Sequence, residues 1–273
     1  MKQLLNHTIR FLLFSNCWVA LSVGMLVTGL AHHHYVESCF YWGLFAFSGT
    51  FVTYNFHRLV RNRSFQSAQI STARGRWLTK NRRFIIICVG IFTAVTAILY
   101  FPFPLKPTSF WLMLIAGAIV LGYAIRIPVI GISLREISGL KNIWITAVWV
   151  LLFYFILLES THTIHYADLI YIGLFTFVQI IPFDIRDLSY DSPSMKTIPQ
   201  LIGVRGAQII GTILIGFITY SIFRSHTFHF LLVLTAICAL FGLWWKQTPH
   251  RILMLEFMWD GTLIVLGLYY YFV

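Results

Sequence analysis

The chain has 273 residues, of which 58% are hydrophobic, 17% aromatic and only 11% charged, with a mean hydropathy of +0.78. A soluble domain carries about 25% charged residues, so this composition excludes a protein whose surface faces mainly water. The formal net charge of +11 would by itself suit a nucleic-acid-binding protein, and the distribution of the basic residues decides that question below.

Long apolar runs recur along the whole chain at lengths near the roughly 17–25 residues that cross about 30 Å of hydrocarbon. Their apolarity is continuous rather than alternating, which predicts membrane helices. In chain order we expect nine spans, at about 9–30, 40–57, 84–103, 110–125, 143–158, 167–183, 207–223, 228–245 and 252–273. The first run is long enough to span and lacks a cleavage site, so we expect no signal peptide. The predicted fold class is therefore all-α, a polytopic integral membrane protein with a single membrane domain over 1–273.

The basic residues fall almost entirely on one side of this predicted topology. Of the 20 Lys and Arg residues, only Lys106 and Arg224 lie in segments on the other side. Cytoplasmic loops are enriched in Lys and Arg, which predicts a cytoplasmic N-terminus and an outer C-terminus. Orientation and anionic lipid explain the net charge, so the expected partner is the bilayer, with no nucleic acid. The basic inner face also suits a bacterial inner (plasma) membrane.

The cysteines and histidines give weaker signals. The four cysteines are scattered without CxxC pairing, which favours packing residues over a disulfide or zinc framework. His32, His33 and His34 form a run between the first two spans. This run is either a metal site or, as we favour, a hydrated loop.

The acidic residues are the most informative feature, because the chain has only nine. Asp184, Asp187 and Asp191 follow the sixth span within a single short segment. Their spacings place all three carboxylates on one helical face if the helix continues past Pro182. Like charges at these spacings repel, so a counter-charge is expected, and Mg²⁺ is a hard cation that prefers oxygen ligands.

This segment resembles the second aspartate motif of the UbiA superfamily of intramembrane prenyltransferases. The matching residues are Asp184, Arg186, Asp187, Asp191, Lys196, Thr197, Pro199 and Gly203. The predicted nine helices, with this motif between spans six and seven, also resemble that family. The segment GYAIRIPVIG followed by GLKNIWIT is similar to the family's connection between spans four and five.

The resemblance implies a UbiA-like helical cage around a tunnel for an isoprenoid chain. It implies an enzyme that uses Mg²⁺ to bind a prenyl diphosphate and transfers the isoprenyl group to a lipid-soluble or aromatic acceptor. By matching positions, Asp184, Asp187 and Asp191 would hold metal. Arg186 and Lys196 would contact phosphate oxygens.

The family's first motif, Asn-Asp-x-x-Asp-x-x-x-Asp, is missing. Asn55 matches its asparagine, but Phe56, Leu59 and Arg63 occupy the three aspartate positions, which leaves at most one metal site. We hypothesise that Arg58, with His57 and Arg61, neutralises the diphosphate directly, with Asn55 beside it. The alternative is that these are ordinary positive-inside residues.

Two further residues are candidates on other grounds. Asp260 lies deep in the last predicted span, where an acid is costly unless it faces the protein interior or water. Glu256 lies one turn away, and the alternative for both is a buried ion pair with Arg or Lys. Arg126 either contacts the diphosphate at the cavity mouth or anchors the fourth span.

Three functions are compatible with the sequence. The first is a prenyltransferase, and the second is a catalytically inactive homologue that binds an isoprenoid or lipid or partners another membrane enzyme. The missing first motif favours the second reading, whereas the retained acids favour the first. A small transporter is the least favoured, because the sequence has no repeat symmetry.

Overall fold

The computed structural model describes residues 2–64, 72–101, 106–128, 131–160, 166–188, 195–224, 230–245 and 252–273. Within these ranges the chain forms eleven α-helices and one short 3₁₀ turn (Leu134–Glu136). The helices are α1 (Lys2–Phe14), α2 (Cys17–His33), α3 (Cys39–Ser64), α4 (Ala73–Lys80), α5 (Arg82–Tyr100), α6 (Pro107–Ala124), α7 (Lys141–Ser160), α8 (Tyr166–Asp187), α9 (Ile198–Phe223), α10 (Phe230–Trp244) and α11 (Ile252–Phe272).

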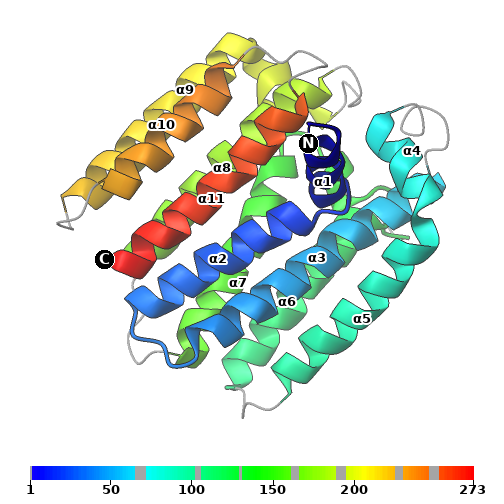
Figure 1. Cartoon of the computed structure of the whole chain (residues 1–273), viewed down its shortest axis with the longest axis horizontal. Coiled ribbons are helices and arrows are strands. Elements are labelled where there is room, and N and C mark those ends of the chain that lie inside the picture. Colours follow the sequence, from blue (N-terminus) through cyan, green and yellow to red (C-terminus); the bar gives the residue numbers. More distant parts are fainter. Residues whose placement is uncertain are drawn as a thin grey trace.

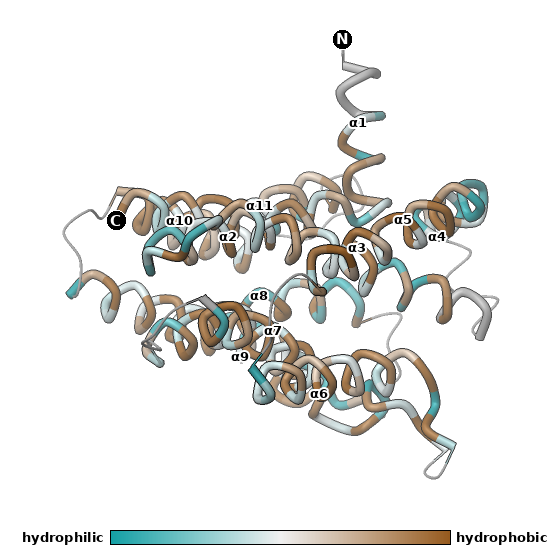
Figure 2. Tube along the Cα trace, turned by 90° about the horizontal axis from the view of Figure 1, so that it is seen from below, coloured by the Kyte–Doolittle hydropathy of each residue, from teal (hydrophilic) through white to brown (hydrophobic). Residues whose placement is uncertain are grey.

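The long helices are arranged in two rows (Figures 1 and 2). One row contains α5, α3, α2, α11 and α10, and the other contains α6, α7, α8 and α9. Contacts between α10 and α9 join the rows at one edge, and contacts between α3 and α6 join them at the other. The rows therefore enclose an interior, which is where the candidate site lies.

Among the described residues, six helices are individually long and apolar enough to cross a membrane: α5, α6, α7, α8, α9 and α11. The bent pair of α1 and α2 would make a seventh span, and α10 is apolar but shorter. The all-helical membrane architecture is thus as expected, whereas the number of nine spans stays a prediction.

The first predicted span, 9–30, is not one continuous helix. α1 and α2 meet at an angle of 70°, and Figure 2 shows α1 projecting away from the two rows. Asn16, between them, has a left-handed backbone conformation with φ 60°, which Asn tolerates better than most residues. The Asn16 side-chain amide donates to Oδ1 of Asn55 at 3.0 Å, and Asn55 donates to the carbonyl of Ser15 at 2.9 Å. These bonds fix the bend.

The helices α2 and α11 pack closely against each other at glycines. A Cβ atom on Gly29 would lie 1.9 Å from the carbonyl oxygen of Gly267, so only glycine permits this approach. Small residues at such crossings are typical of membrane helices, whose association depends on close packing. α9 bends at Gly203, where φ is 76°, a conformation that favours glycine.

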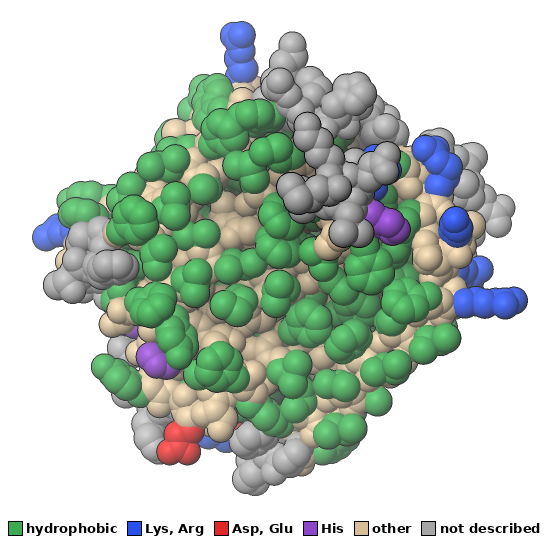
Figure 3. All heavy atoms as spheres, in the orientation of Figure 1, with side chains coloured by type: hydrophobic (Ala, Val, Ile, Leu, Met, Phe, Trp, Pro, Cys, Tyr) green, Lys and Arg blue, Asp and Glu red, His purple; other side chains and the backbone are tan. Residues whose placement is uncertain are grey.

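The outer surface is strongly apolar. Large hydrophobic side chains such as Ile87, Ile98, Trp111 and Ile213 are more than half exposed, and Figure 3 shows hydrophobic side chains covering most of one face. The Lys and Arg side chains visible there lie around the edge of that face. This distribution is the one expected for a protein that faces lipid across its middle and water at its ends.

Candidate functional site

A cavity of about 280 Å³ lies between the two rows of helices. Its volume is close to the lower end of the range for small-molecule sites. The charged and imidazole side chains on its wall are His57, Arg58, Arg74, Arg135, Lys141, Asp184, Arg186, Asp187, Glu256 and Asp260. The apolar and aromatic ones are Leu13, Val19, Tyr54, Ile119, Val120, Tyr123, Trp144, Ile145, Val148, Trp149, Ile180, Phe183 and Leu263.

The polar and apolar walls are separated along the helices. On α7 the wall runs from Lys141 to Trp149, a distance of about 12 Å at 1.5 Å per residue. On α11 it runs from Glu256 through Asp260 to Leu263. Along both helices the cavity-lining positions are thus charged first and apolar further on. The cavity has a charged end and an apolar end.

Glu256 is the centre of a buried ion-pair network at the charged end. One of its oxygens accepts from Nη2 of Arg74 at 2.7 Å, and the other pairs with Arg186. Arg74 also donates to the carbonyl of Leu13 at 3.0 Å, near the end of α1, where helix carbonyls lack intrahelical donors. The network therefore ties α1, α4, α8 and α11 together. For Glu256, the structure shows the ion pair that the sequence left as an alternative.

The two described aspartates of the second motif are both paired with cations of the chain. Nζ of Lys141 lies 2.6 Å from Oδ1 of Asp184, and both side chains are almost fully buried. Arg186 holds Asp187 with a two-pronged contact, Nε to Oδ1 at 2.7 Å and Nη2 to Oδ2 at 2.9 Å. Lys141 and Arg186 thus supply the counter-charge that the sequence assigned to a metal.

The fit of this site to Mg²⁺ is limited by these ion pairs. Asp184 and Asp187 both line the cavity and offer the carboxylate oxygens that Mg²⁺ prefers. Arg186, however, engages both oxygens of Asp187. The donor chemistry suits a single ion, and its binding requires Arg186 to release Asp187. Asp191 lies outside the described residues.

The other sequence candidates are divided between the cavity and the surface. His57, Arg58 and Asp260 line the cavity, and Nε2 of His57 lies 3.0 Å from the carbonyl of Val120. The side chain of Arg61 lies outside the described part of the structure.

Three predicted diphosphate contacts do not line the cavity. Arg126 is 65% exposed at its side chain and pairs with Glu136 at 3.2 Å. Lys196 is exposed, in a left-handed conformation with φ 46°. Asn55 is fully buried in the bend between α1 and α2.

Sequence reasoning missed three basic residues of the cavity. Arg74 is in α4, in a stretch of basic residues that the positive-inside rule explains equally well. Arg135 lies in the 3₁₀ turn before α7, and Lys141 is the first residue of α7. Only the similarity of this connection to the UbiA family pointed to them. Arg74 and Glu256 are 182 positions apart, so no local pattern could pair them.

The described cavity wall carries five Arg or Lys side chains and four carboxylates. Three of the carboxylates are in ion pairs, and Asp260 is the one for which no ion pair occurs within the described residues. The wall has more positive than negative charge even before the half-buried His57 is considered. Such a wall favours an anionic ligand.

Comparison with known proteins shows which solved structures have a similar fold. No family model and no curated protein matches the chain. Among solved structures, a UbiA homologue from Archaeoglobus fulgidus bound to GPP and Mg²⁺ is similar, with 14% identity, a TM-score of 0.55 and coverage of 97% of this chain and 98% of that chain. The Cd²⁺-bound structure of a UbiA homologue from the same organism gives 15% identity, a TM-score of 0.51 and the same coverage.

These likenesses extend over nearly the whole chain. Over its described residues the chain is an all-helical membrane-type bundle with an internal cavity, and its fold is the UbiA fold. The resemblance inferred from the residues around Asp187 is thus confirmed at the level of the fold.

Proposed function

We propose that the chain is a prenyltransferase-like membrane enzyme that binds a prenyl diphosphate in this cavity. The observation that carries the proposal is the division of the cavity into a charged and an apolar end. A prenyl diphosphate has the same division, with several negative charges on its head and a hydrocarbon tail. A structural relative was solved with GPP and Mg²⁺, which supports the same ligand class here.

In this proposal the diphosphate lies among Arg58, Arg74, Arg135 and Arg186. Arginine is suited to this role because its planar fork binds phosphate oxygens in pairs. One Mg²⁺, held by Asp187 with Asp184 and Asp191, would add positive charge where the leaving group becomes negative. The arginines would neutralise the remaining negative charge of the diphosphate, because the first aspartate motif is absent.

The isoprenyl chain lies along the apolar wall. Tyr54, Tyr123, Trp144 and Trp149 face the cavity there, and aromatic faces stabilise a nearby cation. When the allylic C–O bond breaks, its electron pair leaves with the diphosphate and a positive charge develops on the carbon chain. Side chains that pack around the chain also exclude water from that carbon.

The acceptor then forms a bond to the allylic carbon and loses a proton. We propose that Asp260 accepts this proton, because it is the cavity carboxylate without an ion pair in the described structure. Asp260→Asn is expected to bind the donor as the wild type does and to form no product. Weakened donor binding in this variant would instead place Asp260 among the diphosphate contacts.

The test is binding of geranylgeranyl diphosphate to detergent-purified protein, with and without Mg²⁺. We expect Mg²⁺-enhanced binding in the wild type and its loss in Asp187→Asn with Asp191→Asn. Magnesium-independent binding that survives the double substitution would show that arginines alone hold the head group. No binding by folded protein under any condition would refute the proposal.

A second function is favoured by one observation, the pairing of Asp184 with Lys141 and of Asp187 with Arg186. If these pairs persist with ligand bound, the chain is a catalytically inactive homologue that binds an isoprenoid or lipid. Release of diphosphate from the bound donor distinguishes the two functions. The enzyme releases it, and the binding protein does not.

We further propose that the membrane is the cell's inner (plasma) membrane, that the charged end of the cavity is cytoplasmic, and that the acceptor is lipid-soluble or aromatic. The basic residues at that end support this orientation. The apolar surroundings favour an acceptor that arrives through the bilayer.

A further inference from the structure

A second polar cluster lies at the opposite end of the bundle from the charged end of the cavity. His33 and His34 end α2, and Asp168 is in the first turn of α8. Asn16, on the cavity wall, precedes α2, so about 25 Å of helix separates it from His33. Asp168 and the cavity residue Asp184 are similarly separated along α8. The cluster is therefore independent of the site described above.

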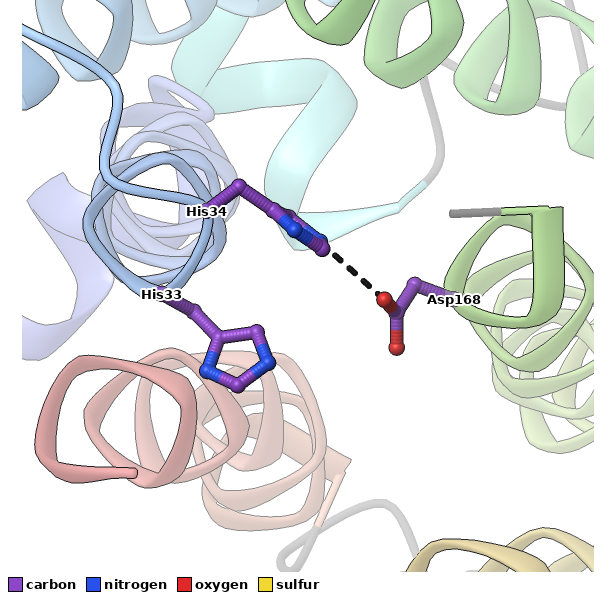
Figure 4. Close-up of side chains that lie close together, drawn as sticks. All are labelled: His33, His34 and Asp168. Carbon is purple, nitrogen blue, oxygen red and sulfur yellow. Dashed lines mark ion pairs between the residues drawn. The ribbon is translucent and has the colours of Figure 1, made fainter. Parts of the chain in front are cut away.

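The three side chains converge (Figure 4). Nε2 of His34 lies 3.0 Å from Oδ2 of Asp168. The His33 ring lies 5.0 Å from the His34 ring, centroid to centroid. One ligand atom from each residue can be chosen so that all three lie within 4.8 Å of one another. Two helices from opposite rows thus bring two imidazoles and one carboxylate to one point.

The surroundings stabilise this arrangement. The side chains of His34 and Asp168 are only 5% and 11% exposed. The hydroxyl of Tyr270, on α11, donates to Oδ1 of Asp168 at 3.3 Å, which leaves Oδ2 directed at His34. The rings of His33 and Tyr270 lie 5.5 Å apart. Hydrogen bonds that orient a carboxylate or imidazole in this way are typical of metal ligands.

We propose that His33, His34 and Asp168 bind a divalent transition metal of the Zn²⁺ type. Zinc binds imidazole nitrogen and carboxylate oxygen at about 2.0–2.2 Å in tetrahedral geometry, which places ligand atoms about 3.3 Å apart. The His34–Asp168 separation of 3.0 Å is close to this value. The ligand atoms of the three residues lie within 4.8 Å of one another, so metal binding requires the His33 ring to move closer to the other two. Imidazole ligands favour zinc over Mg²⁺, which prefers oxygen.

The metal would join the two rows of the bundle. α2 and α8 belong to opposite rows, and the two histidines and the aspartate are contributed from either side. A bound ion would link the C-terminal end of α2 to the N-terminal end of α8. Its effect is on the stability of the bundle, because a ligand that binds the folded state raises stability by mass action.

The experiment measures metal content and ligand geometry in detergent-purified protein from which any polyhistidine tag has been removed. Wild-type protein incubated with Zn²⁺ and desalted is expected to retain about one equivalent per chain and to show a higher Tm than chelator-treated protein. His33→Ala is expected to lose the bound zinc and the Tm increase. His32→Ala is the matched control, since His32 is exposed and stacks on Tyr271; it should retain both.

A second variant, His34→Cys, tests the site independently if His33→Ala is unstable. His34→Cys removes the ion pair with Asp168 but supplies a thiolate, a strong zinc and cobalt ligand. Bound Co²⁺ in this variant should show the sulfur-to-metal charge-transfer absorption that the wild type lacks. Zinc retained equally by wild type and His33→Ala, no zinc retained by folded wild type, or no thiolate band would each overturn the proposal and leave an ion pair only.

Discussion

The cavity has arginines at its charged end, and the aspartates of the UbiA first motif are missing. The position where the UbiA first motif has aspartates contains Phe56, Leu59 and Arg63, and the charged end of the cavity instead receives Arg58, Arg74 and Arg135. A metal-bound carboxylate cluster and a group of guanidiniums both present positive charge to a diphosphate. They differ in that guanidiniums need no ion and cannot be titrated near neutral pH.

Arg58 and Arg126 were both candidate diphosphate contacts in the sequence, and the structure separates them. Arg58 lines the cavity, whereas Arg126 is exposed and paired with Glu136. Arg58→Ala should weaken prenyl diphosphate binding by about tenfold to a hundredfold, which corresponds to one hydrogen bond between charged groups. Arg126→Ala should leave it unchanged. Calorimetric titration of both variants checks this, and equal losses would contradict the placement.

Glu256 neutralises two arginines, so the loss of its charge should lower the stability of the folded protein. Glu256→Gln leaves Arg74 and Arg186 without their shared carboxylate, and the cost should be below the roughly 3–5 kcal/mol of a fully buried broken pair, because both arginines are partly exposed. We expect a lower Tm. Inorganic pyrophosphate should restore part of it by binding the released guanidiniums.

Scanning fluorimetry with and without pyrophosphate measures both effects. Glu37→Gln is the control, because Glu37 is exposed on the loop between α2 and α3. If pyrophosphate stabilises the Glu37 and Glu256 variants equally, Glu256 does not compete with the ligand for the arginines.

At the element scale, the helices of the bundle were largely predictable, because continuous apolarity over about 20 residues has few alternatives. The bend between α1 and α2 was not. Phe11–Leu30 is uncharged, and the polar pair Ser15 and Asn16 resembles ordinary packing residues of a span. The bend depends on Asn55, about 40 positions away, and this distance hides it from any local pattern.

The left-handed conformation of Asn16 gives a test of this bend. Asn16→Gly loses the bond to Asn55 but adopts φ 60° without strain, so its Tm should fall only slightly. Asn16→Val loses the same bond and adds a β-branched side chain that disfavours positive φ. We expect a clearly larger drop in Tm for the valine variant, and equal Tm values would show that the bend does not require this conformation.

At the scale of the whole molecule, the sequence predicted the fold family from a motif and could not predict the pairing inside the cavity. Asp184, Asp187 and Asp191 were expected to share a helical face; the first two line one cavity wall, and Asp191 lies outside the described residues. Their partner Lys141 comes from another helix, and the network that includes Arg74 spans both rows. Interactions of this range depend on how the helices assemble, which a single sequence does not encode in any local pattern.

The same assembly makes the orientation testable. The charged end of the cavity, with α4, should face the cytoplasm, and the His33–Asp168 end should face outward, because Lys and Arg concentrate at the former. With the four native cysteines replaced, a single cysteine at Arg76, exposed on α4, should react with a membrane-impermeant maleimide only after the cells are permeabilised. A cysteine at Glu37 should react in intact cells. The reverse pattern would place the cavity mouth outside, where no cytoplasmic prenyl diphosphate could enter it, and would refute the proposed function together with the orientation.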